Sequence, residues 1–256
     1  MWPKEHGAYG QLTLPVVTAL AGAGVSTAGL AVAIAAAACF LAHEPASILL
    51  GLRGVRAKRE QGRAAARWLG WCALTAAAAG AVSLMTIPDS VGWSLAVPVV
   101  PAALLAVVTM SGREKSWYGE TLAAIAFSAL AVPIAMSAGS PAAVAVAIAL
   151  PFALLFVTST LAVRSVILRV RGGGDPRASA ATGRSAAAIM ASGAAGTAWL
   201  SWLGVLPAET LGAIGPGLLA VLAIVMRPPP PTRLRNVGWT LVAISVLTGM
   251  VVIASF

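Results

Sequence analysis

The sequence predicts an all-α fold, a polytopic bundle of transmembrane helices, and three observations support this. Of its 256 residues, 59% are hydrophobic and only 10% are charged, whereas a soluble domain has about 45–50% apolar and about 25% charged residues. The mean hydropathy is +0.90. The charged residues fall in a few short blocks between long apolar runs. Because about 20 apolar residues cross the hydrocarbon layer of a membrane, these runs exclude an ordinary soluble domain.

Charged blocks and short turns divide the chain into about nine spans. Where no charged block separates two apolar runs, turns are predicted at Ser26–Gly29, Pro88–Asp89 and Gly139–Pro141. These turns leave no room for a separate soluble domain, so residues 1–256 are predicted to form one transmembrane domain. The predicted spans cover about residues 11–27, 29–51, 68–86, 91–110, 119–137, 142–166, 186–203, 207–226 and 237–255.

The basic residues predict the orientation of these spans. All 17 Lys and Arg residues lie before the first span or near the loops after the second, fourth, sixth and eighth spans. Of the acidic residues, only Asp89 and Glu209 fall on the opposite side. Cytoplasmic loops carry an excess of Lys and Arg, so the N-terminus is predicted to be cytoplasmic. The net charge of +9 then reflects membrane topology, and no nucleic-acid partner is predicted.

Ionisable residues inside the spans are the first candidates for functional groups, because they are costly in hydrocarbon. His43 and Glu44 lie about 21 Å along the second span, at about 1.5 Å per residue. Pro45 removes a backbone donor and can open the helix toward a water-filled cavity. The alternative is a helix that ends at Ala42, with both side chains in the membrane interface.

Arginines next to the second and sixth spans predict an anion site at the cytoplasmic mouth of the bundle. Arg53 and Arg56 follow the second span, and Arg164 and Arg169 close the sixth. A guanidinium group binds phosphate or carboxylate with two parallel hydrogen bonds. The alternative for each arginine is ordinary contact with lipid headgroups.

The N-terminal segment adds a second adjacent Glu–His pair on the predicted cytoplasmic side. Glu5 and His6 follow Lys4, and they lie on the same side of the membrane as His43 and Glu44. Two His and two Glu side chains are able to bind a transition metal. Because they have no fixed ligand spacing, no metal site is predicted and the cofactor is left open.

Several of these segments together resemble one family. The sequence is similar, over essentially its whole length, to the YwiC-like family of bacterial integral membrane proteins. The resemblance implies a multi-pass protein of the bacterial cytoplasmic membrane and no particular activity. It rests on Lys4-Glu5-His6-Gly7-Ala8 with Pro15 downstream, on His43-Glu44-Pro45 leading to Arg53, on Arg113-Glu114-Lys115, and on Arg164 with Arg169.

The predicted topology is also similar, more distantly, to that of the UbiA-type intramembrane prenyltransferases. Those proteins are nine-helix bundles whose loops after helices two and six carry Asp-rich motifs that hold magnesium and a prenyl diphosphate. Residues 43–67 and 164–184 occupy these positions here. The chain's two aspartates, Asp89 and Asp175, are predicted on opposite sides of the membrane, so no dimagnesium site carries over. A diphosphate would have to be held directly by Arg and Lys, or the chemistry has been lost.

Three functions stay open at this point, and with them the question of whether the protein is an enzyme. The first is binding of an anionic lipid, phosphate-bearing or quinone-related and of isoprenoid type, with its head in the basic mouth. The second is a proton-coupled transporter in which His43 and Glu44 form a relay. The third is a non-catalytic component of a membrane assembly, with residues 59–67 as the partner surface. For the first function, the acid–base candidates are Glu44, His43 and His6, and the ligand-binding candidates are Lys4, Glu5, Arg53, Arg56, Arg113, Lys115, Arg164 and Arg169.

Overall fold

The computed structural model describes residues 6–169 and 176–256, and every regular element in those two ranges is a helix. The prediction of an all-α bundle is therefore confirmed. The elements are α1 (His6–Gly22), α2 (Thr27–Leu49), α3 (Val55–Thr86), the 3₁₀ helix η1 (Asp89–Leu95), α4 (Ala96–Met110), α5 (Trp117–Ala129), α6 (Ala131–Ser137), α7 (Ala142–Leu168), α8 (Pro176–Trp202), α9 (Glu209–Met226), the 3₁₀ turn η3 (Pro231–Arg233) and α10 (Leu234–Ser255).

Seven helical segments among the described residues are long and apolar enough to cross a membrane, which confirms a multi-pass membrane protein. Two of them combine neighbouring elements, η1 with α4 and α5 with α6. Helix α1, with 17 residues, and α8, which is rich in Ser, Gly and Ala, are not among the seven. The count of nine spans therefore stays a prediction.

Several helix boundaries differ from the predicted spans, and three of the differences have a local reason. Helix α3 begins at Val55 rather than near residue 68, because Arg, Lys, Glu and Gln are good helix formers and continue the helix outside an apolar run. Helix α8 begins at Pro176, and proline is favoured in the first turn. The fifth span breaks at Leu130, since Pro133 has no N–H to donate to the carbonyl of Ala129.

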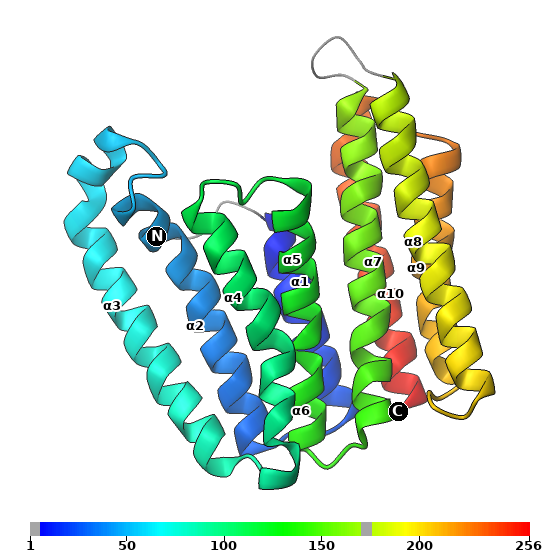
Figure 1. The fold of residues 1–256 in the computed structure, drawn as a ribbon, viewed down its shortest axis with the longest axis horizontal. Coiled ribbons are helices and arrows are strands. Elements are labelled where there is room, and N and C mark those ends of the chain that lie inside the picture. The colour runs from blue at the N-terminus through cyan, green and yellow to red at the C-terminus, as the bar shows by residue number, and fades with distance from the viewer. Residues whose placement is uncertain (1–5, 170–175) are drawn as a thin grey trace.

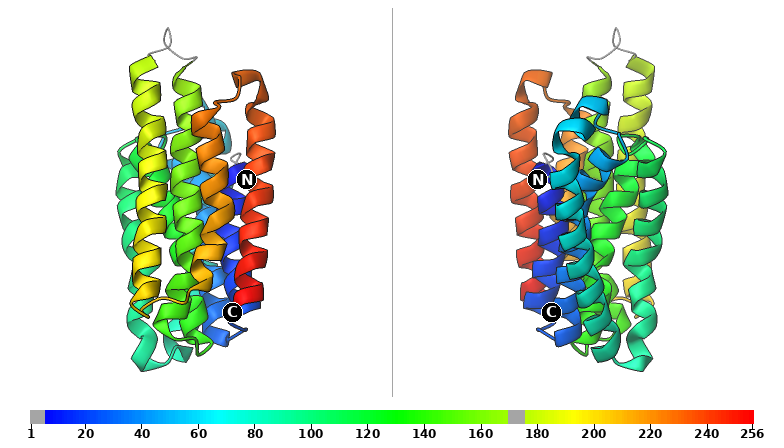
Figure 2. Two further views of the ribbon diagram at one scale, coloured as in Figure 1. Left: turned by 90° about the vertical axis from the view of Figure 1, so that its right-hand side faces the viewer. Right: turned by 90° about the vertical axis from the view of Figure 1, so that its left-hand side faces the viewer.

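The helices run up and down along a common direction (Figures 1 and 2). The connections 50–54, 111–116 and 227–233 lie at one end of the bundle, at the top of Figure 1, and we call this the basic end. The turns before α2, η1, α7 and α9, and the C-terminus, lie at the opposite end (Figure 1). Among the described residues, the loops predicted to share one side therefore do so.

Helix α7 forms the centre of the bundle and packs against α1, α5, α6, α8, α9 and α10. Phe152 and Leu155 of α7 are almost fully buried beside Met190 of α8 and Val221 of α9. A second apolar cluster surrounds Ile134 of α6. The tightly packed core therefore lies around α6 and α7.

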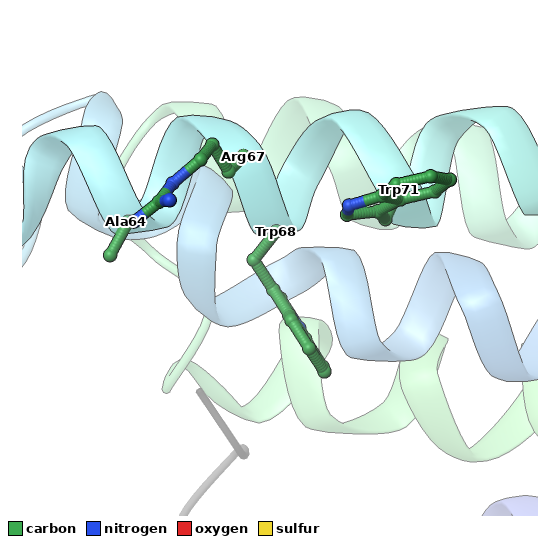
Figure 3. Close-up of a pocket in the computed structure, with 4 residues that line it drawn as sticks. All are labelled: Ala64, Arg67, Trp68 and Trp71. Atoms are coloured by element: carbon green, nitrogen blue, oxygen red, sulfur yellow. The ribbon is translucent and has the colours of Figure 1, made fainter.

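Helix α3, in contrast, lies at the edge of the bundle. It packs along α2 and makes no comparable contact with any other described helix. Its buried residues form one stripe that faces α2: Ala65, Cys72, Ala79 and Ser83. A hollow beside this stripe is lined by Ala64, Arg67, Trp68 and Trp71 (Figure 3).

Candidate functional site

The last two turns of α2 carry His43 and Glu44, as the sequence predicted. The helix continues through Pro45 to Leu49, so the alternative of a helix ending at Ala42 is wrong. Pro45 is buried, and its missing N–H leaves the carbonyl of Leu41 without the usual helical donor. The side chains of His43 and Glu44 are 32% and 14% exposed. Both lie on α2 near the basic end of the bundle.

A tight loop after α2 folds Arg53 back onto this helix. Gly51 and Gly54 have φ angles of +78° and +92°, which residues with a Cβ atom rarely adopt. The turn is closed by hydrogen bonds from the Gly54 N–H to the carbonyl of Gly51 (2.9 Å) and from the Leu52 N–H to the carbonyl of Ser47 (2.9 Å). The two glycines thus reverse the chain around Arg53.

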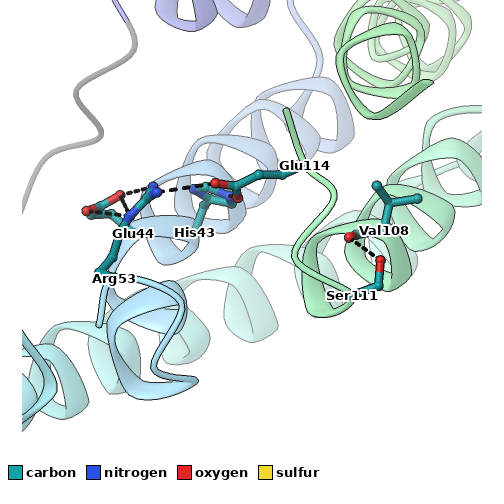
Figure 4. Close-up of polar contacts among 6 residues, drawn as sticks. All are labelled: His43, Glu44, Arg53, Val108, Ser111 and Glu114. Carbon is teal, nitrogen blue, oxygen red and sulfur yellow. Dashed lines mark hydrogen bonds and ion pairs between the residues drawn. The ribbon is translucent and has the colours of Figure 1, made fainter. Parts of the chain in front are cut away.

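A second tight loop, between α4 and α5, presents Glu114. Gly112 has a φ angle of +70°, and Ser111 donates its hydroxyl to the carbonyl of Val108 at 2.7 Å (Figure 4). Ser116 caps α5 by accepting the N–H of Gly119 at 3.2 Å. Gly119 has no room for a side chain, because a Cβ atom there would overlap the carbonyl of Glu114. The loop is therefore held in one shape by its own sequence.

These two loops meet in an ion-pair cluster, which we define as His43, Glu44, Arg53 and Glu114 (Figure 4). Arg53 donates from Nη2 to Oε2 of Glu44 at 2.8 Å and from Nε to both oxygens of that carboxylate at 3.2 and 3.3 Å. Its Nη1 donates to Oε1 of Glu114 at 3.2 Å. One guanidinium group thus joins two carboxylates from different parts of the chain.

His43 completes the cluster from α2. Its Nε2 lies 2.9 Å from Oε2 of Glu114. An ionised carboxylate only accepts hydrogen bonds, so Nε2 is the donor in this contact, and in a ring with a single N–H the acceptor is then Nδ1. No described residue donates to Nδ1. A histidine oriented by a carboxylate, with its other nitrogen open, is a common form of acid–base group.

The cluster also connects the basic end of α2 to the rest of the bundle. Near the opposite end, Ser26 and Ser137 join α2 to α6 through a 2.8 Å contact between their hydroxyls. Halfway along, the Phe40 ring lies 5.8 Å from that of Phe127 on α5. At the basic end, the ion pairs to Glu114 make the connection.

Arg164 of α7 reaches the other side of the α4–α5 loop. Its Nη1 lies 3.4 Å from both the carbonyl of Lys115 and Oε2 of Glu120. The side chains of Arg164 and Glu120 are 33% and 40% exposed. Arg113 and Lys115 are exposed on the same loop, on either side of Glu114. The structure thus brings together the predicted residues His43, Glu44, Arg53, Arg113, Lys115 and Arg164.

Of the other predicted site residues, Arg56 and Arg169 do not join this group. Arg56 pairs with Glu60, one turn along the exposed face of α3, at 2.8 Å. Arg169 donates to the hydroxyl of Ser179 at 3.0 Å and so connects α7 to α8. Lys4, Glu5 and the side chain of His6, the first residue of α1, lie outside the part of the chain that the structure describes.

Sequence reasoning missed Glu114 and Glu120 as site residues. The available signal was Glu114 itself, an acid between two basic residues in a loop that carried the family resemblance.

The two carboxylates and the histidine of the cluster are not arranged as metal ligands. Among the described residues, no three His, Cys, Asp or Glu side chains converge closely enough to hold a metal ion.

The family model for YwiC-like proteins matches residues 2–135, just over half of the chain. The chain belongs to the YwiC-like family. All four residues of the ion-pair cluster fall within the matched segment, whereas Arg164 lies outside it. No curated protein and no solved structure matches the chain, so the similarity to UbiA-type proteins stays a prediction from topology.

Proposed function

We propose that this YwiC-like protein binds the head of an anionic, phosphate-bearing or quinone-related lipid at its basic end. In this proposal the head lies against the α4–α5 loop, next to the His43–Glu114 pair, and an isoprenoid tail lies along the apolar helices. The observation that carries the proposal is that one loop, 111–116, contacts both α2 and α7 through Glu114 and Lys115. The loop therefore connects His43 of α2 with Arg164 of α7 at the basic end.

The orientation belongs to the same proposal. The basic end faces the cytoplasm of a bacterium, and α1 and α8 cross the membrane with the seven candidate spans, which makes nine spans. Lys and Arg at the ends of α2, α4, α7 and α9 support this orientation by the positive-inside rule. A ligand from the cytoplasmic leaflet then reaches the cluster without crossing the hydrocarbon layer.

The charges around the loop support an anionic head. Arg53 is already engaged by two carboxylates, so it orients Glu44 and Glu114 rather than meeting the ligand alone. Arg113 and Lys115 are exposed beside the cluster. Their positive charges attract the anionic head of the ligand. Arg164 holds the loop through the carbonyl of Lys115. Any transfer of a prenyl group would use these cations in place of the missing Asp-rich motifs.

The His43–Glu114 pair supplies the acid–base step of this proposal. The neutral His43 ring accepts a proton at Nδ1 from an acidic O–H of the head, and the Glu114 carboxylate stabilises the imidazolium that forms. Glu44 is held by three donations from Arg53. Its role is to fix Arg53, and through Arg53 to fix Glu114.

Native mass spectrometry of the detergent-purified protein, with extraction of bound lipids, tests the proposal. We expect a retained prenyl phosphate or quinone-type species that is lost from the Arg113→Ala/Lys115→Ala variant. The matched control is Arg233→Ala/Arg235→Ala, because these exposed arginines lie at the same end beside α10. Equal lipid retention in wild type and both variants, or no such lipid at all, contradicts the proposal.

A proton-coupled transporter is the second candidate, and the position of the cluster favours it. Protonation of Glu114 would weaken its bonds to His43 and Arg53, which connect the basic ends of α2 and the α4–α5 loop. A pH change would then alter how these segments contact each other. Anion flux into proteoliposomes driven by a pH gradient, and abolished in Glu114→Gln, would support transport.

A further inference from the structure

Helix α3 is longer than a membrane is thick. It has 32 residues, which corresponds to about 48 Å at about 1.5 Å per residue. The hydrocarbon layer is about 30 Å thick. No charged residue occurs from Trp68 to Thr86, a stretch of about 28 Å that matches this layer. The chain from Val55 to Arg67 therefore lies in the headgroup region and beyond.

This outer part of α3 is strongly basic and exposed. It carries Arg56, Lys58, Arg59, Arg63 and Arg67 against a single acid, Glu60. Anionic lipid surfaces attract each such cation with about 1 kcal/mol when it lies near the headgroups. The attraction falls off within a Debye length of about 8–10 Å. Arg67, next to the apolar stretch, is the cation closest to the lipid phosphates.

Arg67 belongs to the hollow on α3, which has a volume of about 360 Å³ (Figure 3). Its four residues, Ala64, Arg67, Trp68 and Trp71, are spaced i, i+3, i+4 and i+7 and so share one face of the helix. Ala64 leaves space beside the guanidinium group. Trp71 is 67% exposed, in the position of an aromatic anchor at a membrane interface.

Trp68, which lines the hollow, carries a hydrogen-bond donor without a partner. Its side chain extends from α3 toward α2 (Figure 3). The indole Nε1 is buried and has no hydrogen-bond partner in the described part of the chain. A buried donor without a partner costs about 1–3 kcal/mol.

We infer that this hollow is a binding site for an anionic phospholipid of the surrounding bilayer. The phosphate lies on Arg67, the glycerol backbone contacts Trp71, and the acyl chains follow the apolar face of α3 toward Thr86. The lipid comes from the bilayer because α3 is at the edge of the bundle and, among the described helices, packs closely only on α2. This site is separate from the α4–α5 loop and does not depend on the proposed function.

The test is native mass spectrometry of the full chain in detergent with phosphatidylglycerol and excess phosphatidylcholine. We expect Arg67→Ala to lower the fraction of protein that retains phosphatidylglycerol by about fivefold. The matched control is Arg59→Ala, which removes the same charge two turns farther from the apolar stretch. Arg59→Ala and Arg113→Ala/Lys115→Ala should retain phosphatidylglycerol as wild type does.

Unchanged retention in Arg67→Ala overturns the inference. Equal losses in Arg67→Ala and Arg59→Ala also overturn it, because they would show diffuse attraction rather than a site. Arg67→Lys keeps the charge without the planar fork, and partial recovery of retention supports direct binding of the phosphate. Thermal unfolding of each variant excludes loss of the fold as the cause.

Discussion

Arg53 and Glu114 form a 3.2 Å ion pair between residues that are 61 positions apart in the chain. The contact joins the loop after α2 to the loop before α5, and each loop contains glycine with a positive φ angle. Because Arg53 also holds Glu44 and Glu114 also accepts from His43, this single pair organises the whole cluster.

Replacing Glu114 with Ala should lower the free energy of unfolding by about 1–3 kcal/mol, because half-buried His43 and Arg53 lose a shared partner. Thermal unfolding in detergent measures the change. Arg56→Ala is the matched control, since the side chains of Arg56 and Glu60 are 89% and 56% exposed and such a pair contributes about 0.3–0.5 kcal/mol. Equal effects of the two substitutions would contradict this description of the cluster.

A double-mutant cycle should show that Arg53 and Glu114 are coupled. For residues in one ion-pair network, we expect the double variant to depart from additivity by about 0.5–3 kcal/mol. The comparison pair is Arg164 and Glu120, whose side chains are 33% and 40% exposed and whose coupling should fall below about 1 kcal/mol. Additive effects for Arg53 and Glu114 would show that the pair contributes nothing to stability.

Gly119→Ala should disturb the cluster from outside it. The new Cβ atom would overlap the backbone carbonyl of Glu114, and such overpacking costs about 1–3 kcal/mol. Gly70→Ala is the control, because a Cβ atom on this helical glycine meets nothing within 4 Å and should stabilise α3 by about 0.5–1 kcal/mol. The unfolding midpoints of the two variants measure these effects. A Gly119→Ala variant with the midpoint of the wild type would contradict the prediction, because it would mean that the loop tolerates movement.

The orientation is testable with single cysteines in a chain without Cys39 and Cys72. Ser111 and Asp89 are exposed at the basic end and the opposite end. In intact cells, a membrane-impermeant maleimide should label Asp89→Cys, and it should label Ser111→Cys only after permeabilisation. The reverse labelling pattern would place the basic end outside the cell.

The all-α class, the multi-pass bundle and the shared side of the basic loops followed from the sequence, because each depends on local hydropathy and charge. The start of α3 was predicted too late, because the helix was expected to begin only where the apolar run begins. Charged residues such as Arg56 and Glu60 continue a helix in water as readily as apolar ones do in lipid.

The site followed from the sequence only in part. His43, Glu44 and Arg53 were found because they interrupt or border an apolar span, and Pro45 marked the segment. Their partner Glu114 was missed because its contact with His43 links residues 71 positions apart. Spacing along the chain carries no information about that distance.

The location of the bound lipid tests the central claim most directly. Trp117 and Trp239 are both exposed near the basic end, on α5 and α10, so each accepts photoreactive benzoylphenylalanine in its place. After irradiation in native membranes, mass spectrometry of the adducts should find a prenyl phosphate or quinone-type lipid at position 117 and only bulk phospholipid at position 239. The same phospholipid adducts at both positions would contradict a ligand site at the α4–α5 loop.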